Sequence, residues 1–333
     1  MGETIKGYKG FNKDMTCRGK QYKENTTYEE DGTEICKAGM MHFCENPYDV
    51  LDYYPLVNED GDISDFAEVE AVGEVKKDGN KCATTKLHIG AKLGLKAFLK
   101  ACIDFTLEKT KYESEDTELS NDISEDYAKI GSSGDYAKIG SSGDYAKIGS
   151  SGDSAQIGSS GNSAQIGSSG YYAKIGSSGD SAQIGSSGYY AKIGSSGDYA
   201  KIGSSGDSAQ IGSSGNSAQI GSSGDYAQIG SSGYYAKIGS SGDSAQIGSS
   251  GDYAQIVSEG KNSVVMAAGY NSIARAKIGS WITLAEWVKT GEKNENGSYI
   301  WIPKCVKTEY VDGERIKENT FYKLVDGEFK ECE

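Results

Sequence analysis

The sequence has few of the residues that catalytic sites and disulfide frameworks depend on. Its 333 residues include only 3 prolines and 2 histidines, and the 7 cysteines lie outside the long central region. An odd number of scattered cysteines favours reduced thiols over a secreted disulfide framework. With His42 and His88 as the only histidines, a Ser/His/Asp or Cys/His catalytic set has few possible centres.

Positive charge and long apolar segments are also scarce. The formal net charge is −14, so the chain should repel the phosphates of nucleic acids, and we expect no nucleic acid partner. No apolar run approaches the roughly 18 residues that span a bilayer, and the start of the chain lacks the apolar core of a signal peptide. We therefore expect a soluble protein of the cytoplasm with no membrane partner.

Glycine, in contrast, is abundant, and it belongs to a repeat. The nonapeptide DYAKIGSSG recurs in fifteen copies from Asp126 to Ile256. Every copy has Ala at the third place and Ile at the fifth, whereas the second place is Tyr or Ser and the fourth is Lys or Gln. A disordered Gly/Ser linker is the alternative, but a linker has no reason to keep Ala and Ile at fixed places.

The alternation within Y-A-K-I predicts a short strand whose Ala and Ile point into a core. Ala137, Ile139, Ala200 and Ile202 are examples of these expected core residues. The G-S-S-G-D stretch is then the turn, in which glycine can adopt a positive φ. One short strand per fixed period is typical of a parallel β-solenoid, so the predicted fold is mainly β.

Each coil of this solenoid could hold two nonapeptides or three. Ala and Ile fill the space between two sheets about 10 Å apart, which favours a two-sided coil of two nonapeptides. A three-sided coil of three nonapeptides would instead stack one column of tyrosines: Tyr145, Tyr172, Tyr199, Tyr226 and Tyr253. Gene duplication also explains that column, because residues 144–170 and 198–224 are identical.

The sequence offers only weak metal-binding patterns, and we predict no metal and no cofactor. The repeat resembles the calcium-binding pattern G-G-x-G-x-D-x-U-x, but its Asp is one place early and is replaced by Asn or Tyr in five copies. Cys36, His42 and Cys44, with Cys17 upstream, lack the paired spacing of structural zinc sites.

The segments that flank the repeats predict separate folded parts. Residues 1–107 read as an α+β domain with a strand at 66–75, a helix that begins at Asn46-Pro47, and a helix at 91–105. The second helix should bury Leu95, Phe98, Leu99 and Cys102 on one face.

Four further segments complete the predicted organisation. We expect residues 108–125 to form an acidic connector or a degenerate first coil, 126–260 the solenoid, 261–280 its cap and 281–333 a small β domain. In the last of these, Asp312-Gly313 and Asp326-Gly327 are predicted hairpin turns.

Both ends of the chain resemble a known group of proteins. YKGFNKDMTCRG, HFCENPYDVLDYY and FAEVEAVGEV are similar to an uncharacterised N-terminal domain of phage and prophage proteins, and SWITLAEW and KENTFYKLVDGEF resemble the C-terminal segment that accompanies it. This resemblance implies a mobile-element origin but no activity. The segments SAQIG and NSVVM are similar to repeats in the β-roll heads of trimeric bacterial adhesins.

The N-terminal segment also resembles, loosely, an ADP-ribosyltransferase core. Tyr8-Lys9-Gly10, the segment with Tyr53 and Tyr54, and the FAEVE strand carry this resemblance. It implies an NAD-binding and catalytic role for His42 and for Glu68 or Glu70. A non-catalytic binding or assembly domain remains the favoured interpretation, with both glutamates on the solvent face of a strand.

The outward face of the repeat is the predicted binding surface. In a two-sided coil Tyr127 should stack on Tyr145, Tyr172 on Tyr190 and Tyr235 on Tyr253. Aromatic and cationic side chains on a rigid scaffold lose little entropy on binding, which suits them as interface anchors. The partner would be a host or phage protein, as for an inhibitor of host defence, or a glycan or receptor, as for a tail-fibre or adhesin-like module in a virion; a homo-oligomer is left open. The candidate residues are Tyr127, Tyr145, Tyr172, Tyr190, Tyr199, Tyr226, Tyr235, Tyr253, Lys174 and Lys192.

Overall fold

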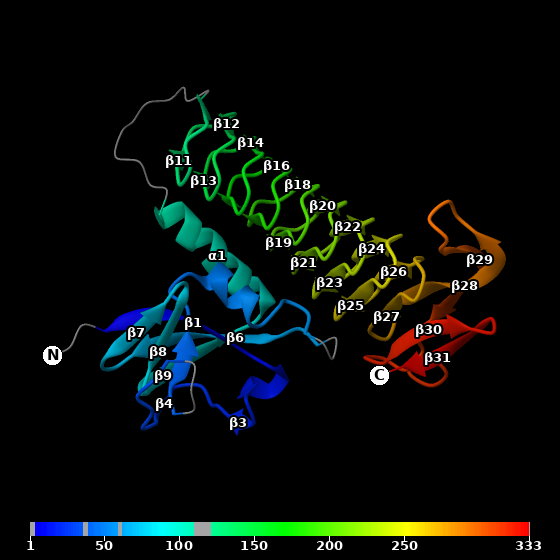
Figure 1. Ribbon diagram of the computed structural model, residues 1–333, viewed down its shortest axis with the longest axis horizontal. Helices are drawn as coiled ribbons and strands as arrows, with labels where there is room; N and C mark the ends of the chain where they lie inside the picture. The colour runs from blue at the N-terminus through cyan, green and yellow to red at the C-terminus, as the bar shows by residue number, and fades with distance from the viewer. Residues whose placement is uncertain (1–3, 36–38, 59–61, 110–120, 333) are drawn as a thin grey trace.

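A long β-solenoid and an N-terminal domain that lies on one side of it make up the chain (Figure 1). The computed structural model describes residues 4–35, 39–58, 62–109 and 121–332. Cys36 and residues 110–120 of the predicted acidic connector lie outside these residues. Residues 121–123 of that segment form a strand that pairs with the solenoid, so this end of it belongs to a first coil. The solenoid has about nine turns between residues 129 and 284, so the fold is mainly β, as predicted.

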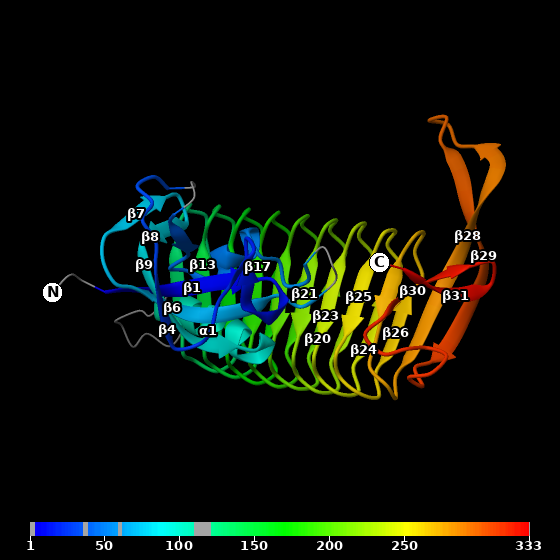
Figure 2. The same ribbon diagram turned by 90° about the horizontal axis from the view of Figure 1, so that it is seen from below.

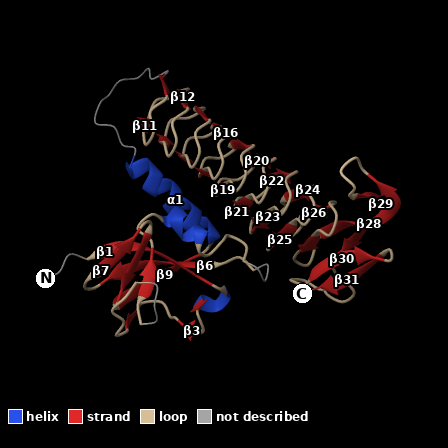
Figure 3. Cartoon of the chain, in the orientation of Figure 1, coloured by secondary structure: helices blue, strands red, loops and turns tan. Residues whose placement is uncertain are grey.

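The N-terminal domain combines three small antiparallel sheets with one long helix (Figure 3). Its largest sheet has the order β1-β6-β9-β4, and the other two are β5-β8-β7 and β2-β3. The elements are β1 (Ile5–Phe11), the 3-10 helix η1 (Lys13–Met15), β2 (Thr16–Cys17), β3 (Lys20–Gln21), β4 (Thr26–Glu29), β5 (Met41–Phe43), the 3-10 helix η2 (Pro47–Asp52), β6 (Asp65–Ala71), β7 (Val75–Asp78), β8 (Lys81–Thr84), β9 (Lys86–Leu93) and the helix α1 (Leu95–Lys109).

Local sequence signals explain the helices of this domain. The Asn46 side chain accepts a hydrogen bond from the Tyr48 amide at 3.1 Å, and Pro47 occupies the first turn of η2, as predicted. Helix α1 buries the predicted face of Leu95, Phe98, Leu99 and Cys102. It begins later than predicted because β9 continues to Leu93.

The solenoid coils are two-sided, with two nonapeptides in each, and the three-sided alternative is wrong. Strands from alternate nonapeptides build two parallel sheets, in which Lys138 pairs with Gln156 and Lys147 with Gln165. We call them the covered sheet and the open sheet, for reasons given below. The covered sheet contains β11 (Lys129–Ser132), β13 (Lys147–Ser150), β15 (Gln165–Ser168), β17 (Gln183–Ser186), β19 (Lys201–Ser204), β21 (Gln219–Ser222), β23 (Lys237–Ser240), β25 (Gln255–Ser258) and β27 (Ile273–Arg275). The open sheet contains β10 (Asn121–Ile123), β12 (Lys138–Ser141), β14 (Gln156–Ser159), β16 (Lys174–Ser177), β18 (Lys192–Ser195), β20 (Gln210–Ser213), β22 (Gln228–Ser231), β24 (Gln246–Ser249) and β26 (Val264–Ala267).

The strand within each nonapeptide lies later than the sequence predicted. It runs over K/Q-I-G-S, whereas the tyrosine or serine of the second place lies in the turn and has a φ between 55° and 61°. Ile139, Ala200 and Ile202 are buried as predicted, while Ala137, in an early coil, is only half-buried. The core therefore consists of Ala, Ile and the seventh-place Ser, and the outward residues are Lys or Gln and the sixth-place Gly.

Glycine at the ninth place is explained by close stacking of coils, not by a positive φ. No glycine of the fifteen copies has a positive φ among the described residues. A β-carbon on Gly152 would overlap the carbonyl oxygen of Gly134 in the preceding coil, and the same clash recurs along the stack. Only glycine lets successive turns approach this closely.

The N-terminal domain packs on the covered sheet through α1, which runs along the coils (Figures 1 and 2). The sixth-place glycines of that sheet form a row under the helix. Gly203 lies beneath Leu99, Gly185 beneath Ile103, and Gly221 near Leu95. Because these positions lack side chains, α1 can lie directly on the sheet.

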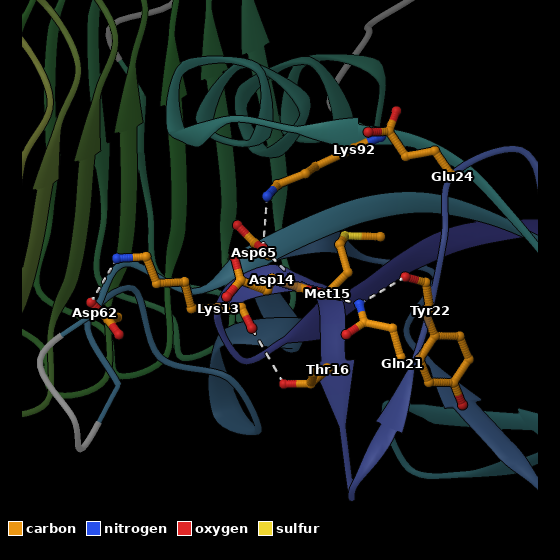
Figure 4. A network of polar contacts seen from close by, with 10 residues as sticks. All are labelled: Lys13, Asp14, Met15, Thr16, Gln21, Tyr22, Glu24, Asp62, Asp65 and Lys92. Atoms are coloured by element: carbon orange, nitrogen blue, oxygen red, sulfur yellow. Dashed lines mark hydrogen bonds and ion pairs between the residues drawn. The ribbon is translucent and has the colours of Figure 1, made fainter.

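Polar contacts also hold the N-terminal domain on the covered sheet, near the C-terminal end of the solenoid. Asp62 accepts a hydrogen bond from Arg275 at 2.7 Å and another from Lys13 at 3.1 Å, and Figure 4 shows the second of these. Burial acts to raise the pKa of Asp62, but these two hydrogen bonds outweigh it, so the pKa is lowered. The ionised carboxylate therefore stabilises the docked arrangement.

The C-terminal part of the chain, from Trp281 onward, extends both sheets of the solenoid. The long hairpin β28 (Trp281–Lys293) and β29 (Tyr299–Tyr310) continues the open sheet, and the hairpin β30 (Phe321–Val325) and β31 (Glu328–Cys332) continues the covered sheet. Strands β26 and β27, in the segment expected as a cap, still belong to the coils.

Of the two predicted Asp-Gly hairpin turns, one is confirmed. Asp326-Gly327 joins β30 and β31, and both residues have a positive φ. Asp312-Gly313 is not a hairpin turn, because the next strand begins only at Phe321. Instead, the Asp312 carboxylate accepts hydrogen bonds from three backbone amides, at Glu314, Arg315 and Ile316, and organises a loop.

Candidate binding surface on the open face of the solenoid

The two faces of the solenoid have the same outward residues but different surroundings. The N-terminal domain lies on the covered sheet, whose sixth-place glycines are buried. On the open sheet the same glycines are exposed, and a β-carbon placed on Gly158, Gly176, Gly194, Gly212 or Gly230 would meet no atom of the described chain within 4 Å. The open sheet therefore presents a bare glycine row where the covered sheet holds a helix.

This row is the floor of a groove of about 1430 Å³ that runs along the open sheet. The fourth-place residues form one wall: Lys138, Gln156, Lys174, Lys192, Gln210, Gln228 and Gln246. Lysine is the only charged residue type in this wall. The groove is thus smooth, amide-lined and locally positive, although the whole chain is acidic.

The groove ends in an apolar patch at the C-terminal side of the open sheet. Val264 and Met266 replace the fourth- and sixth-place residues in β26, and Trp281 follows in register on β28. All three side chains are between 43% and 49% exposed. Trp281 lies against Tyr310 with ring centroids 5.1 Å apart. Exposed apolar residues that adjoin a groove are typical of an interaction site.

The candidate tyrosines divide between the two edges of the solenoid. Those that precede strands of the covered sheet lie on one edge, which we call the domain edge: Tyr127, Tyr145, Tyr199, Tyr235 and Tyr253. Those that precede strands of the open sheet lie on the other, the open edge: Tyr172, Tyr190 and Tyr226. The predicted stacks of Tyr127 on Tyr145 and of Tyr235 on Tyr253 lie on the domain edge, with centroids 5.0 and 4.9 Å apart.

A cluster of four tyrosines lies on the open edge beside the groove. Tyr172 stacks on Tyr190 with ring centroids 5.2 Å apart, and Tyr171 stacks on Tyr189 at 5.3 Å. The sequence prediction included the first pair but missed the second. The two second-place residues precede Lys174 and Lys192, the candidate lysines of the groove wall. We call these six residues the tyrosine–lysine cluster.

This cluster interrupts a hydrogen-bond ladder that supports the rest of the edge. At most first places an Asp or Asn side chain accepts a hydrogen bond from the amide one coil further on, as Asp153 does from Tyr171 at 2.8 Å. Tyr171 and Tyr189 lack the carboxylate or amide oxygen, close to the backbone, that accepts this bond, and no acceptor of this kind serves the amides of Tyr189 and Asp207 within the described chain. The tyrosines thus replace a stabilising contact at the place where they gather.

The backbone conformation of the second-place tyrosines also indicates that these side chains have a role beyond the turn. The second-place residues have a positive φ, which Asn adopts more readily than a bulky side chain does. Two later turns indeed have Asn262 and Asn271 at that place. Nine of the fifteen copies nevertheless have tyrosine there. Since the turn itself does not require the aromatic ring, the ring must serve stacking or recognition.

A second cavity, of about 670 Å³, lies in the N-terminal domain. Lys9 is 5% exposed, its ammonium donates to the His42 carbonyl at 2.8 Å, and burial lowers its pKa. Burial and then Lys9 lower the pKa of His42 to about 4. This cavity brings together most residues of the transferase interpretation, namely Tyr8, Lys9, Gly10, His42, Tyr53 and Tyr54, but neither of its candidate glutamates, Glu68 and Glu70, lines it.

The structure describes three residues of the weak zinc pattern, and these do not form a metal site. Cys17, His42 and Cys44 all line the cavity of the N-terminal domain, and the Tyr54 hydroxyl donates to the Cys17 sulfur at 3.0 Å. No group of three or more His, Cys, Asp or Glu side chains suited to a metal ion occurs among the residues that the structure describes. Within the same residues, no helix is both long and apolar enough to cross a membrane.

Fold and surface together define a β-solenoid protein with one face occupied by its own N-terminal domain and the other face open. Residues 5–101 match the family model of a domain of unknown function (DUF7666), which supplies the N-terminal domain. Comparisons with curated proteins and with solved structures gave no match.

Proposed function

We propose that this chain is a non-catalytic binding protein whose open sheet and tyrosine–lysine cluster hold a partner protein. One observation carries the proposal: the two sheets have the same outward residues, and one of them is already a protein-binding surface within the chain. The open sheet repeats that surface and adds a cluster of stacked tyrosines beside lysines. Tyrosine and lysine stems offer apolar contact area together with polar tips.

The resemblance to phage and prophage proteins supports a more specific version of this proposal. The chain would act in the cytoplasm of a bacterial host, where it would capture a host protein and so inhibit a defence response. In the alternative, a tail-fibre or adhesin-like module in a virion, the same surface would bind a receptor or glycan on the cell.

The test is capture of a partner from lysate of the bacterial host by the full chain and by two matched variants. The first variant combines Tyr172→Ser with Tyr190→Ser, a residue that six copies have at that place. The second combines Tyr235→Ser with Tyr253→Ser, which removes an equivalent stack from the domain edge. We expect the first variant to lose most of the captured protein and the second to retain it.

Equal capture by the wild type and both variants would contradict the proposal, because recognition would then belong to the terminal parts of the chain. Binding to whole bacterial cells or to glycans, without capture of a cytoplasmic protein, would favour the virion alternative.

A further inference from the structure

The covered sheet shows how this solenoid holds a helix. Leu95, Leu99 and Ile103 of α1 follow one another at every fourth position, and they lie over Gly221, Gly203 and Gly185 of successive strands. A helix advances about 5.4 Å per turn, and successive strands lie about 4.8 Å apart. One helical turn therefore matches one coil, so a stripe of aliphatic residues can meet a row of glycines at every turn.

The open sheet has the same row without a helix. Its glycines extend from Gly140 in β12 to Gly248 in β24, which is seven strands and roughly 29 Å at about 4.8 Å per strand. A helix of about 19 residues has this length. The shape of the groove also suits a helix, because the glycines at its floor have no side chains and the fourth-place lysines and glutamines form a wall on one side.

Polar contacts beside α1 show which groups the fourth-place residues of the covered sheet bind. Lys201, a fourth-place residue of that sheet, forms an ion pair with Asp52, and the Gln219 side chain accepts a hydrogen bond from the Leu56 amide at 3.2 Å. Tyr145 and Tyr199 line a cleft of about 480 Å³ together with Asp49 and Asp52. Lys201, Tyr145 and Tyr199 of this face thus lie beside acidic residues of η2, a segment of the docked domain that packs next to α1.

The equivalent positions of the open sheet are the tyrosine–lysine cluster. Lys174 and Lys192 correspond to Lys201, and Tyr172 and Tyr190 correspond to Tyr145 and Tyr199, because each nonapeptide places them in the same way relative to its strand. From this correspondence we infer that the open sheet binds an amphipathic helix of a partner protein, which has an aliphatic residue at every third or fourth position and acidic residues beside that stripe. This inference rests on the proposed function and specifies the partner.

The chain itself supplies a probe for the inference. A peptide of residues 95–109 with Cys102→Ala and a lactam between Lys100 and Asp104, an exposed i,i+4 ion pair, should be a stable helix with the α1 stripe. Labelled with fluorescein, it is titrated with the full-length chain and followed by fluorescence anisotropy. The covered sheet is occupied by α1 of the same chain at a high effective concentration, so the peptide can reach only the open sheet.

Variants of the full-length chain then test where the peptide binds. Gly194→Val with Gly212→Val should fill the groove and lower the affinity at least tenfold, and the coil accepts such residues because Val257 and Met266 already stand at sixth places. Gly291→Val makes the same change at an open position outside the groove, in β28, and should leave the affinity unchanged. A peptide with Phe98→Glu and Cys102→Glu, two positions that flank the aliphatic stripe, should bind more tightly, and Lys174→Gln with Lys192→Gln should remove that advantage.

Three outcomes would overturn the inference: no saturable binding of either peptide, binding that the groove-filling variant leaves unchanged, or self-association of the chain that only the groove-filling variant abolishes. The last would make a second copy of the chain the occupant. If the peptides fail but capture of a host protein still depends on Tyr172 and Tyr190, the proposed function stands and only the helical partner is excluded.

Discussion

At the second place of each nonapeptide, a residue with a positive φ turns the chain from one strand to the next. The sequence suggested glycine for this role, but the repeat glycines serve close stacking and the flat floor of the groove instead. Tyrosine at such a place is costly for the backbone, which is why its side chain is informative about function.

First-place aspartates have a structural role in the stack of coils. Their carboxylates accept backbone amides of the next coil, as Asp207 does from Asp225 at 3.0 Å. We predict that a calcium chelator leaves the melting temperature unchanged, whereas Asp207→Ala lowers the free energy of unfolding by about 1 kcal/mol because it removes this acceptor. Thermal unfolding followed by circular dichroism measures both effects, and a fall of many degrees with chelator that calcium restores would contradict the prediction.

Asp49 should make stability depend on pH at the interface with the covered sheet. Burial, and then the neighbouring Asp52, raise the pKa of Asp49 to about 6, while Lys201 and Lys147 act to lower it. Because the folded-state pKa is above the unfolded value of about 3.8, the folded state binds more protons between these values, and stability falls as the pH rises through about 6.

Asp49→Asn should remove this loss, so between pH 4 and pH 7 the free energy of unfolding of the variant should rise by about 2–3 kcal/mol relative to that of the wild type, at about 1.4 kcal/mol per pKa unit. Urea unfolding at several pH values in this range measures the difference. Parallel stability profiles for the two proteins would show that the carboxyl group does not titrate in this way.

At the scale of elements, the two sheets allow a matched comparison. A valine side chain at Gly203 would collide with Leu99 of α1, whereas the same side chain at Gly194 would enter open space. We expect Gly203→Val to destabilise the docked helix by about 1–3 kcal/mol and to expose α1 to protease, and Gly194→Val to leave stability within about 0.5 kcal/mol. Similar protease sensitivity in both variants would mean that α1 does not rest on the glycine row in solution.

Three elements of the N-terminal domain could be predicted from local patterns. The Asn46-Pro47 start, the buried stripe of α1 and the strand at β6 each depend on residues close together in the sequence. Where α1 would dock could not be predicted, because its stripe fits any apolar surface and the glycine row that receives it belongs to a distant part of the chain, beyond the start of the repeats.

For the whole molecule, we expect a rigid rod rather than a flexible linker. Amide exchange and chemical shifts measured by nuclear magnetic resonance should show protected isoleucines and dispersed glycine signals over the nonapeptides. Random-coil shifts there would contradict the fold.

Ile202→Asp should open this rod locally. Ile202 is fully buried between the sheets, so an aspartate there places an unpaired charge in the core. Since each coil contacts only its neighbours, the loss of exchange protection should be greatest in the adjacent coils and decline with distance along the rod. Uniform loss of protection over the whole chain would instead indicate a single cooperative unit.

The sequence by itself determined that the chain stacks short strands in parallel, because Ala and Ile recur at fixed places and the pairing of every second nonapeptide buries them. It also identified tyrosine and lysine as the distinctive outward residues. Only the tertiary structure decided which of them are accessible together, because the coil sends alternate nonapeptides to opposite sheets and the N-terminal domain then covers one sheet. Residues identical in sequence, such as Lys192 and Lys201, thus come to differ through what lies above them.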